Sequence, residues 1–163
     1  MSQKDSLDRI DLKILQALQK DAQIKNRVLA DRVALSPSAC LRRIRELEAR
    51  GLITGYHAHV AIDRIRTVTI VIAQVSFDQH SVGRFVAFDE WTRRTPEVVE
   101  SVRISGHYDY MLRVVVSDVH DWKRIMREMT EGDFGVEKIV SNFLMEDMKS
   151  FGGYPLTPGG SQG

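Results

Sequence analysis

The stretch "LSPSACLRRIRELEARGLI", residues 35–53, carries the signals of a complete amphipathic helix. Ser36 suits the N-cap, Pro37 suits the first helical position, and Gly51 ends the pattern. Its apolar face comprises Cys40, Ile44 and Leu47. Its opposite face comprises Ser38, Arg42, Arg45 and Ala49, with Arg43 beside them. One face therefore suits a core, and the other offers cations and hydroxyls to a partner.

Two further helices are expected before this one. Asp8 can cap the first, which continues to about Lys20, and Asn26 can cap a second, shorter helix. Two short helices joined by a tight turn, the second with a basic face, indicate a helix-turn-helix that binds a DNA major groove. Because Glu46 and Glu48 dilute the basic face, an ordinary surface helix remains an alternative.

Charge is divided unevenly along the 163 residues, although the net charge is only +1. Residues 1–66 hold 13 Lys/Arg and 8 Asp/Glu (+5), whereas residues 67–163 hold 10 and 14 (−4). The first part therefore suits a polyanion. The single cysteine, the lack of a membrane-length apolar run and the polar N-terminus favour a cytoplasmic protein. We expect no metal and no cofactor, since two histidines, His57 and His59, make a poor zinc site.

The rest of the chain predicts a small sheet with two helices. Residues 52–62 alternate like a strand, and residues 63–66 suit a hinge. The elements that follow are expected in the order β-α-β-β-α-β, the ferredoxin-like pattern. They are strands at 67–77, 97–104, 110–116 and 136–149, and helices at about 82–91 and from Asp118 to Gly132. The helices would cover one sheet face, so the other face is expected to be buried by dimerisation.

The segment "ISGHYDYMLRV", residues 104–114, places a glycine and three functional side chains in the turn between two strands. A turn requires neither a histidine nor an aromatic ring, so a ligand-binding role is one hypothesis. The alternative is that Asp109 only caps the turn and Tyr108 only packs at a subunit contact. A third possibility is an enzyme that uses His107 and Asp109 as acid and base, but no nucleophile, nucleotide loop or metal set accompanies them.

The order of these parts resembles the Lrp/AsnC, or feast/famine, family of transcriptional regulators. The similarity covers about residues 5–150 and is strongest in "LDRIDLKILQALQKDAQI" (7–24), "LADRVALSPSACLRRIRELEARGLITGY" (29–56) and "SGHYDY" (105–110). It implies an α+β protein, with a winged-helix-like helix-turn-helix domain, a linker strand that pairs with its copy in a second chain, and a ferredoxin-like RAM domain. The boundaries expected are 1–52, 53–66 and 67–150, followed by a flexible tail at 151–163.

The resemblance also implies the partners and their sites. Double-stranded DNA would meet Ser36, Ser38, Arg42, Arg43 and Arg45, with Arg42 the preferred base contact. A small effector, an amino acid in most of the family, would bind between RAM domains near the turn. Its candidate contacts are Ser105, Gly106, His107, Tyr108, Asp109 and Ser141, the last standing where the family often has threonine. The resemblance implies a homo-oligomer, a dimer or an octamer. An architectural DNA-binding protein without an effector remains the alternative function.

Overall fold

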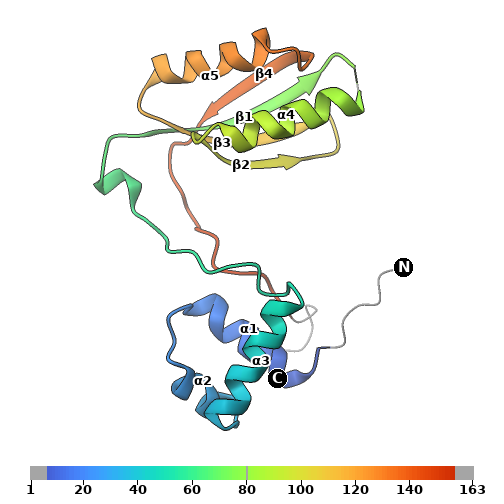
Figure 1. Ribbon diagram of the computed structural model, residues 1–163. Coiled ribbons are helices and arrows are strands. Elements are labelled where there is room, and N and C mark those ends of the chain that lie inside the picture. The colour runs from blue at the N-terminus through green and yellow to red at the C-terminus, as the bar shows by residue number, and fades with distance from the viewer. Residues whose placement is uncertain (1–6, 80, 157–163) are drawn as a thin grey trace. The chain divides into compact units, whose positions relative to one another are not determined.

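The computed structural model describes residues 7–79 and 81–156 and divides the chain into two compact units (Figure 1). The N-terminal unit comprises residues 1–59 together with 149–163, and the C-terminal unit comprises residues 60–148. The chain therefore passes from one unit to the other twice. No helix within the described residues is long and apolar enough to cross a membrane.

Three helices form the N-terminal unit: α1 (Arg9–Lys20), α2 (Asn26–Arg32) and α3 (Pro37–Ala49). Asp8 caps α1 by accepting from the N–H groups of Ile10 and Asp11, and the Asp11 carboxylate accepts from the Asp8 N–H, which completes a capping box. The apolar faces of the helices meet in one core, whose buried members are Ile14, Leu29, Ala30, Val33, Cys40 and Leu47.

The prediction that Asn26 caps the second helix is wrong. Lys25 holds the cap position without a side-chain bond, and Asn26 is the first residue of α2. The Asn26 amide instead donates to the Pro37 carbonyl over 2.8 Å, so it ties the start of α2 to the start of α3. An asparagine at a helix start can bond within its own turn or across to a neighbour, and sequence spacing does not distinguish the two.

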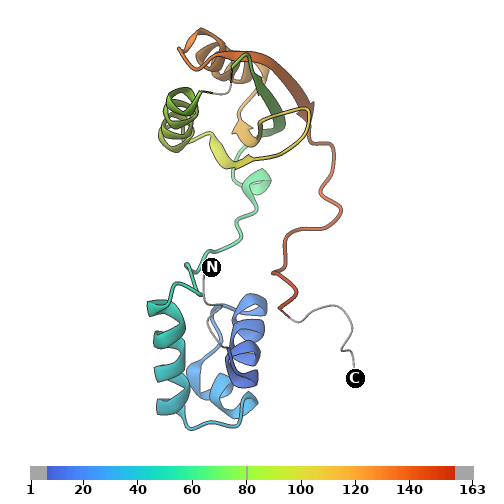
Figure 2. The same cartoon turned by 90° about the vertical axis from the view of Figure 1, so that its right-hand side faces the viewer.

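The C-terminal unit is a four-stranded antiparallel sheet in the order β2-β3-β1-β4. The two helices α4 and α5 lie on one side of it (Figure 2). This is the ferredoxin-like arrangement expected from the sequence. Its elements are β1 (Thr69–Phe77), α4 (Val82–Arg94), β2 (Val98–Arg103), β3 (Tyr110–Val116), α5 (Val119–Glu131) and β4 (Val136–Phe143).

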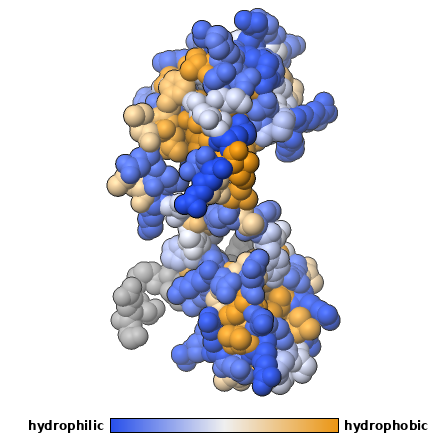
Figure 3. Space-filling view, turned by 90° about the vertical axis from the view of Figure 1, so that its left-hand side faces the viewer, coloured by the Kyte–Doolittle hydropathy of each residue, from blue (hydrophilic) through white to orange (hydrophobic). Residues whose placement is uncertain are grey.

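Strict alternation along the central strands separates two faces of this sheet. Under the helices lie the buried residues Val71, Ala73, Val75 and Phe77 of β1 and Tyr110, Leu112, Val114 and Val116 of β3. Side chains between them point to the other face. The register places Ile70 opposite Val115 and Gln74 opposite both Met111 and Val140. These residues are only partly buried. Figure 3 shows hydrophobic surface, in orange, on the C-terminal unit.

In the connecting segments the structure differs from the sequence expectations at three places. Residues 52–61, all of them described, form no strand, and residues Ile62–Arg64 form a short 3-10 helix. A strand needs a hydrogen-bonding neighbour, and the described residues of the single chain supply none to this segment, so its pairing with a second chain stays a prediction. The last strand ends at Phe143 rather than Lys149. The tail was expected to be flexible from residue 151, yet residues 151–156 are described and Tyr154 bonds to Gln19; residues 157–163 lie outside the described residues.

A charged clamp joins α1 to α3. The guanidinium of Arg43 lies 2.6 Å from Asp8 Oδ2 and 2.8 Å from Asp11 Oδ1. These hydrogen bonds raise the pKa of Arg43, and bonds from the Asp11 backbone and from Arg43 lower the pKa of Asp8. Asp11 is almost buried and also belongs to the capping box. The same carboxylate therefore stabilises the start of α1 and pairs with Arg43 of α3 at the edge of the core.

We expect Asp11→Ala to lower the free energy of unfolding of the N-terminal unit by about 1.5–3 kcal/mol, the range for a hydrogen bond to a charged group. Asp31→Ala removes the same charge from an exposed site on α2 and is the matched control. Both tryptophans, Trp91 and Trp122, lie in the C-terminal unit. Urea unfolding followed by circular dichroism should therefore show the loss, while tryptophan fluorescence should not. Equal losses in the two variants would contradict the clamp.

Candidate functional site

The start of α3 presents two exposed hydroxyls. Ser36 caps the helix by accepting from the Ala39 N–H, and its Oγ lies 3.2 Å from the Oγ of Ser38. The positive end of the α3 dipole adds to these donors, a combination that suits a phosphate oxygen. Both serines are exposed, as a contact with a large partner requires.

Two of the three candidate arginines on α3 are available to a partner. Arg42 is exposed and pairs with Glu46, one turn along the helix, over 2.9 Å. Such exposed pairs contribute only about 0–1 kcal/mol, so Arg42 can exchange Glu46 for another acceptor. Arg45 is exposed and makes no hydrogen bond or ion pair within residues 7–79 and 81–156.

Arg43 differs from its neighbours because its guanidinium is already bound by Asp8 and Asp11. Its side chain is only 25% exposed. Moving it to an outside partner would leave the almost buried Asp11 carboxylate without its cation, which is costly. The geometry therefore gives Arg43 the task of orienting α3 on α1 rather than that of an outside contact.

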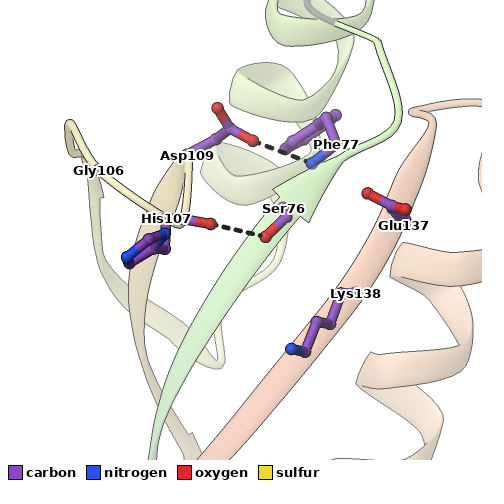
Figure 4. Close-up of a pocket in the computed structure, with 7 residues that line it drawn as sticks. All are labelled: Ser76, Phe77, Gly106, His107, Asp109, Glu137 and Lys138. Atoms are coloured by element: carbon purple, nitrogen blue, oxygen red, sulfur yellow. Dashed lines mark hydrogen bonds between the residues drawn. The ribbon is translucent and has the colours of Figure 1, made fainter.

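A second candidate site lies where three segments of the C-terminal unit meet. A surface pocket of about 510 Å³ opens between the end of β1, the turn before β3 and the start of β4 (Figure 4). Its lining residues are Ser76, Phe77, Gly106, His107, Asp109, Glu137 and Lys138. Gly106 has a φ of +123°, a conformation that a residue with a Cβ adopts only under strain.

The turn is fastened to β1 by hydrogen bonds on both sides of Tyr108. The Asp109 carboxylate accepts from the Phe77 N–H over 2.9 Å, and the Asp109 N–H donates to the Val75 carbonyl. The Ser76 hydroxyl donates to the His107 carbonyl over 3.3 Å (Figure 4). Asp109 therefore holds the pocket in shape, which is the structural role left open by the sequence, and its carboxylate still lines the pocket.

The structure brings together only part of the predicted effector set. Gly106, His107 and Asp109 line the pocket, whereas Ser105 and Tyr108 belong to the turn without lining it. Ser141 lies on the helix-covered face of β4, opposite Ala73. Its hydroxyl accepts from the Trp122 indole N–H over 3.1 Å and donates toward the sulfur of Met126. Ser141 is thus a core hydrogen-bonding residue of this chain, away from the pocket.

Four pocket residues were missed by the sequence reasoning, namely Ser76 and Phe77 of β1 and Glu137 and Lys138 of β4. Glu137 and Lys138 are exposed at the start of β4, beside the end of β1. The β-α-β-β-α-β order contained the signal, because an antiparallel β4 next to β1 must begin where β1 ends. With Glu137, Lys138 and Asp109, the pocket presents carboxylates and an ammonium to one small volume. That combination is complementary to a zwitterion, which carries both charges itself.

Comparisons with known proteins identify both units. Residues 7–54 match the model of a winged helix-turn-helix DNA-binding domain, and residues 70–154 match that of the Lrp/AsnC ligand binding domain. The chain is 34% identical over 143 residues to the transcriptional regulatory protein DoeX of Halomonas elongata, covering 88% of this chain and 90% of that one. Identity to the leucine-responsive regulatory protein of Escherichia coli K12 is also 34%, covering 88% and 87%.

Solved structures agree with this result. A transcriptional regulator of Neisseria meningitidis, NMB0573 in complex with L-Met, superposes with a TM-score of 0.83 at 30% identity, covering 93% of this chain and 97% of that one. An AsnC family regulator of Agrobacterium tumefaciens superposes with a TM-score of 0.82 at 35% identity, covering 92% and 97%. These relatives are regulators and not enzymes, so the acid–base hypothesis for His107 and Asp109 is not retained. The chain belongs to the Lrp/AsnC family of DNA-binding transcriptional regulators.

Proposed function

We propose that this regulator responds to an amino acid bound at the turn pocket. The observation that carries the proposal is the meeting of Asp109, Glu137 and Lys138 in one pocket of about 510 Å³. The carboxylates suit the ligand ammonium, and Lys138 suits the ligand carboxylate. The relative solved with L-Met supports this ligand class. The acting compartment of such a regulator is the cytoplasm, where its DNA is.

For the DNA contacts we propose Ser36, Ser38, Arg42 and Arg45. The two serines would bind phosphate at the helix start, and Arg42 would reach base edges in the major groove. Arg43 is left out of the contact set because Asp8 and Asp11 occupy it. In a dimer, two copies of α3 would enter successive major grooves about 34 Å apart.

The open sheet face supports a homo-oligomer. Ile70, Ile72, Met111, Val115 and Val140 are only partly covered in the single chain, although they lie on the strands that build the core. A second copy of the same face would bury them, and such a two-fold contact is self-complementary.

We expect Arg42→Ala to weaken binding to a selected DNA duplex by ~1–3 kcal/mol while changing binding to a scrambled duplex much less. The matched control is Arg93→Ala, which removes an exposed cation from α4. Fluorescence anisotropy at one fixed salt concentration measures both affinities. Equal losses on the two duplexes would make Arg42 a phosphate contact instead of a base contact.

For the effector site, a thermal-shift screen of the full chain against the twenty amino acids is the direct measurement. A ligand at 100 times its Kd should stabilise the protein by ~2.7 kcal/mol. Lys138→Ala should abolish the shift, and Lys123→Ala, an exposed lysine of α5, should keep it. Asp109→Ala is a poor probe because it also releases Phe77. No shift with any amino acid would favour the architectural alternative.

We expect Ile72→Lys to reduce the assembly mass measured by light scattering, because Ile72 pairs with Arg113 and the open face would then carry adjacent cations. Val86→Lys adds the same charge to an exposed position of α4 and should leave the mass unchanged. An unchanged mass in both variants would place the subunit contact on another surface.

A further inference from the structure

The C-terminal segment forms one side of a groove on the DNA-binding unit. The groove, about 930 Å³ in volume, runs between the C-terminal half of α1 and the segment after α3, and residues 150–154 and 156 form part of its lining. Its helix-side lining is mostly apolar and includes Leu15, Leu18, Gln19, Leu52, Ile53 and Tyr56. These residues belong to the same compact unit as the tail, so the contact lies within one body.

Gln19 holds the tail by both ends of its side-chain amide. Its Oε1 accepts from the Tyr154 N–H over 2.6 Å, and its Nε2 donates to the Tyr154 carbonyl over 3.2 Å. This pairing satisfies a donor and an acceptor of the same residue, as a neighbouring β-strand would. The Phe151 and Tyr154 rings pack edge to face, with centroids 4.9 Å apart, which shapes the segment between them.

Gly153 makes this approach possible. Its φ is +109°, and a Cβ at this position would lie 2.8 Å from Gln19 Oε1, closer than real Cβ contacts. The neighbouring Gly152 has no atom within 4 Å of such a Cβ. The contact with Gln19 therefore requires a glycine at position 153 but not at position 152. A tail that lay loosely on the surface would not have such a requirement.

We propose that residues 150–156 are a docked strap, held against α1 through Gln19, that forms a second tether between the ligand-binding and the DNA-binding units. The first tether is the segment that leaves α3. The second leaves β4, whose first residues line the turn pocket. Docking reduces the freedom of the DNA-binding unit, so releasing the strap lowers DNA affinity. This inference rests on the family assignment and not on the proposed effector.

The test compares Gly153→Ala with Gly152→Ala in the full chain. Amide exchange followed by NMR should show the Tyr154 N–H protected in the wild type and in Gly152→Ala, and exchanging about tenfold or more faster in Gly153→Ala. Gln19→Ala should release the amide similarly. Gln19→Glu retains the acceptor of the shorter bond and should restore part of the protection. A Tyr154 amide that exchanges freely in the wild type would overturn the docking.

The measurement of DNA affinity tests the tethering role of the strap. Fluorescence anisotropy on a selected duplex should give an apparent Kd about threefold or more higher for Gly153→Ala than for Gly152→Ala. Circular dichroism and tryptophan fluorescence establish that both variants are folded. A released strap with unchanged DNA affinity would overturn the tethering role, whatever the outcome of the amino-acid screen.

Discussion

The antiparallel pairing of β1 with β3 on one side and with β4 on the other is the constraint on which the C-terminal unit depends. It buries one face of β1 beneath α4 and α5, and it leaves the opposite face of the same strands partly open. It also brings three chain segments to one end of the sheet. The turn pocket is consequently a product of strand order, because Asp109, Lys138 and Phe77 are distant in the sequence but adjacent across β1.

In the N-terminal unit, charge serves two different purposes on one helix. Arg43 forms ion pairs with Asp8 and Asp11 and so fixes how α3 packs on α1, whereas Arg42 and Arg45 stay exposed. Not every arginine on a basic helix face is therefore available to contact DNA. A guanidinium that is already paired with two carboxylates loses their attraction when it turns outward to another partner. Net charge indicates that a surface suits a polyanion, but only the partners of each arginine show which cations are free.

Local patterns predicted what depends on nearby residues. The caps at Asp8 and Ser36 and the alternation in β3 follow from neighbours a few positions away, and the structure confirms them. The failures involve distant or absent partners. Asn26 bonds to Pro37, and Gln19 bonds to a residue 135 positions away. Among the described residues of the single chain, no strand lies beside residues 52–61. Ser141, a candidate that rests on the resemblance, lies under α5 because of the pairing of β4, and its contact with an effector stays a prediction.

β4 is the element through which ligand and DNA can be coupled. Its first residues line the pocket, its middle pairs with the central strand, and the chain beyond it returns to α1. A ligand changes DNA binding only if it favours one arrangement of the protein over another. A ligand contacting Lys138 acts on the strand that carries the strap, and Asp109 ties the facing turn to β1. The coupling therefore requires no contact between the ligand and α3, because the chain that leaves β4 in the C-terminal unit continues into the segment held against α1 in the N-terminal unit.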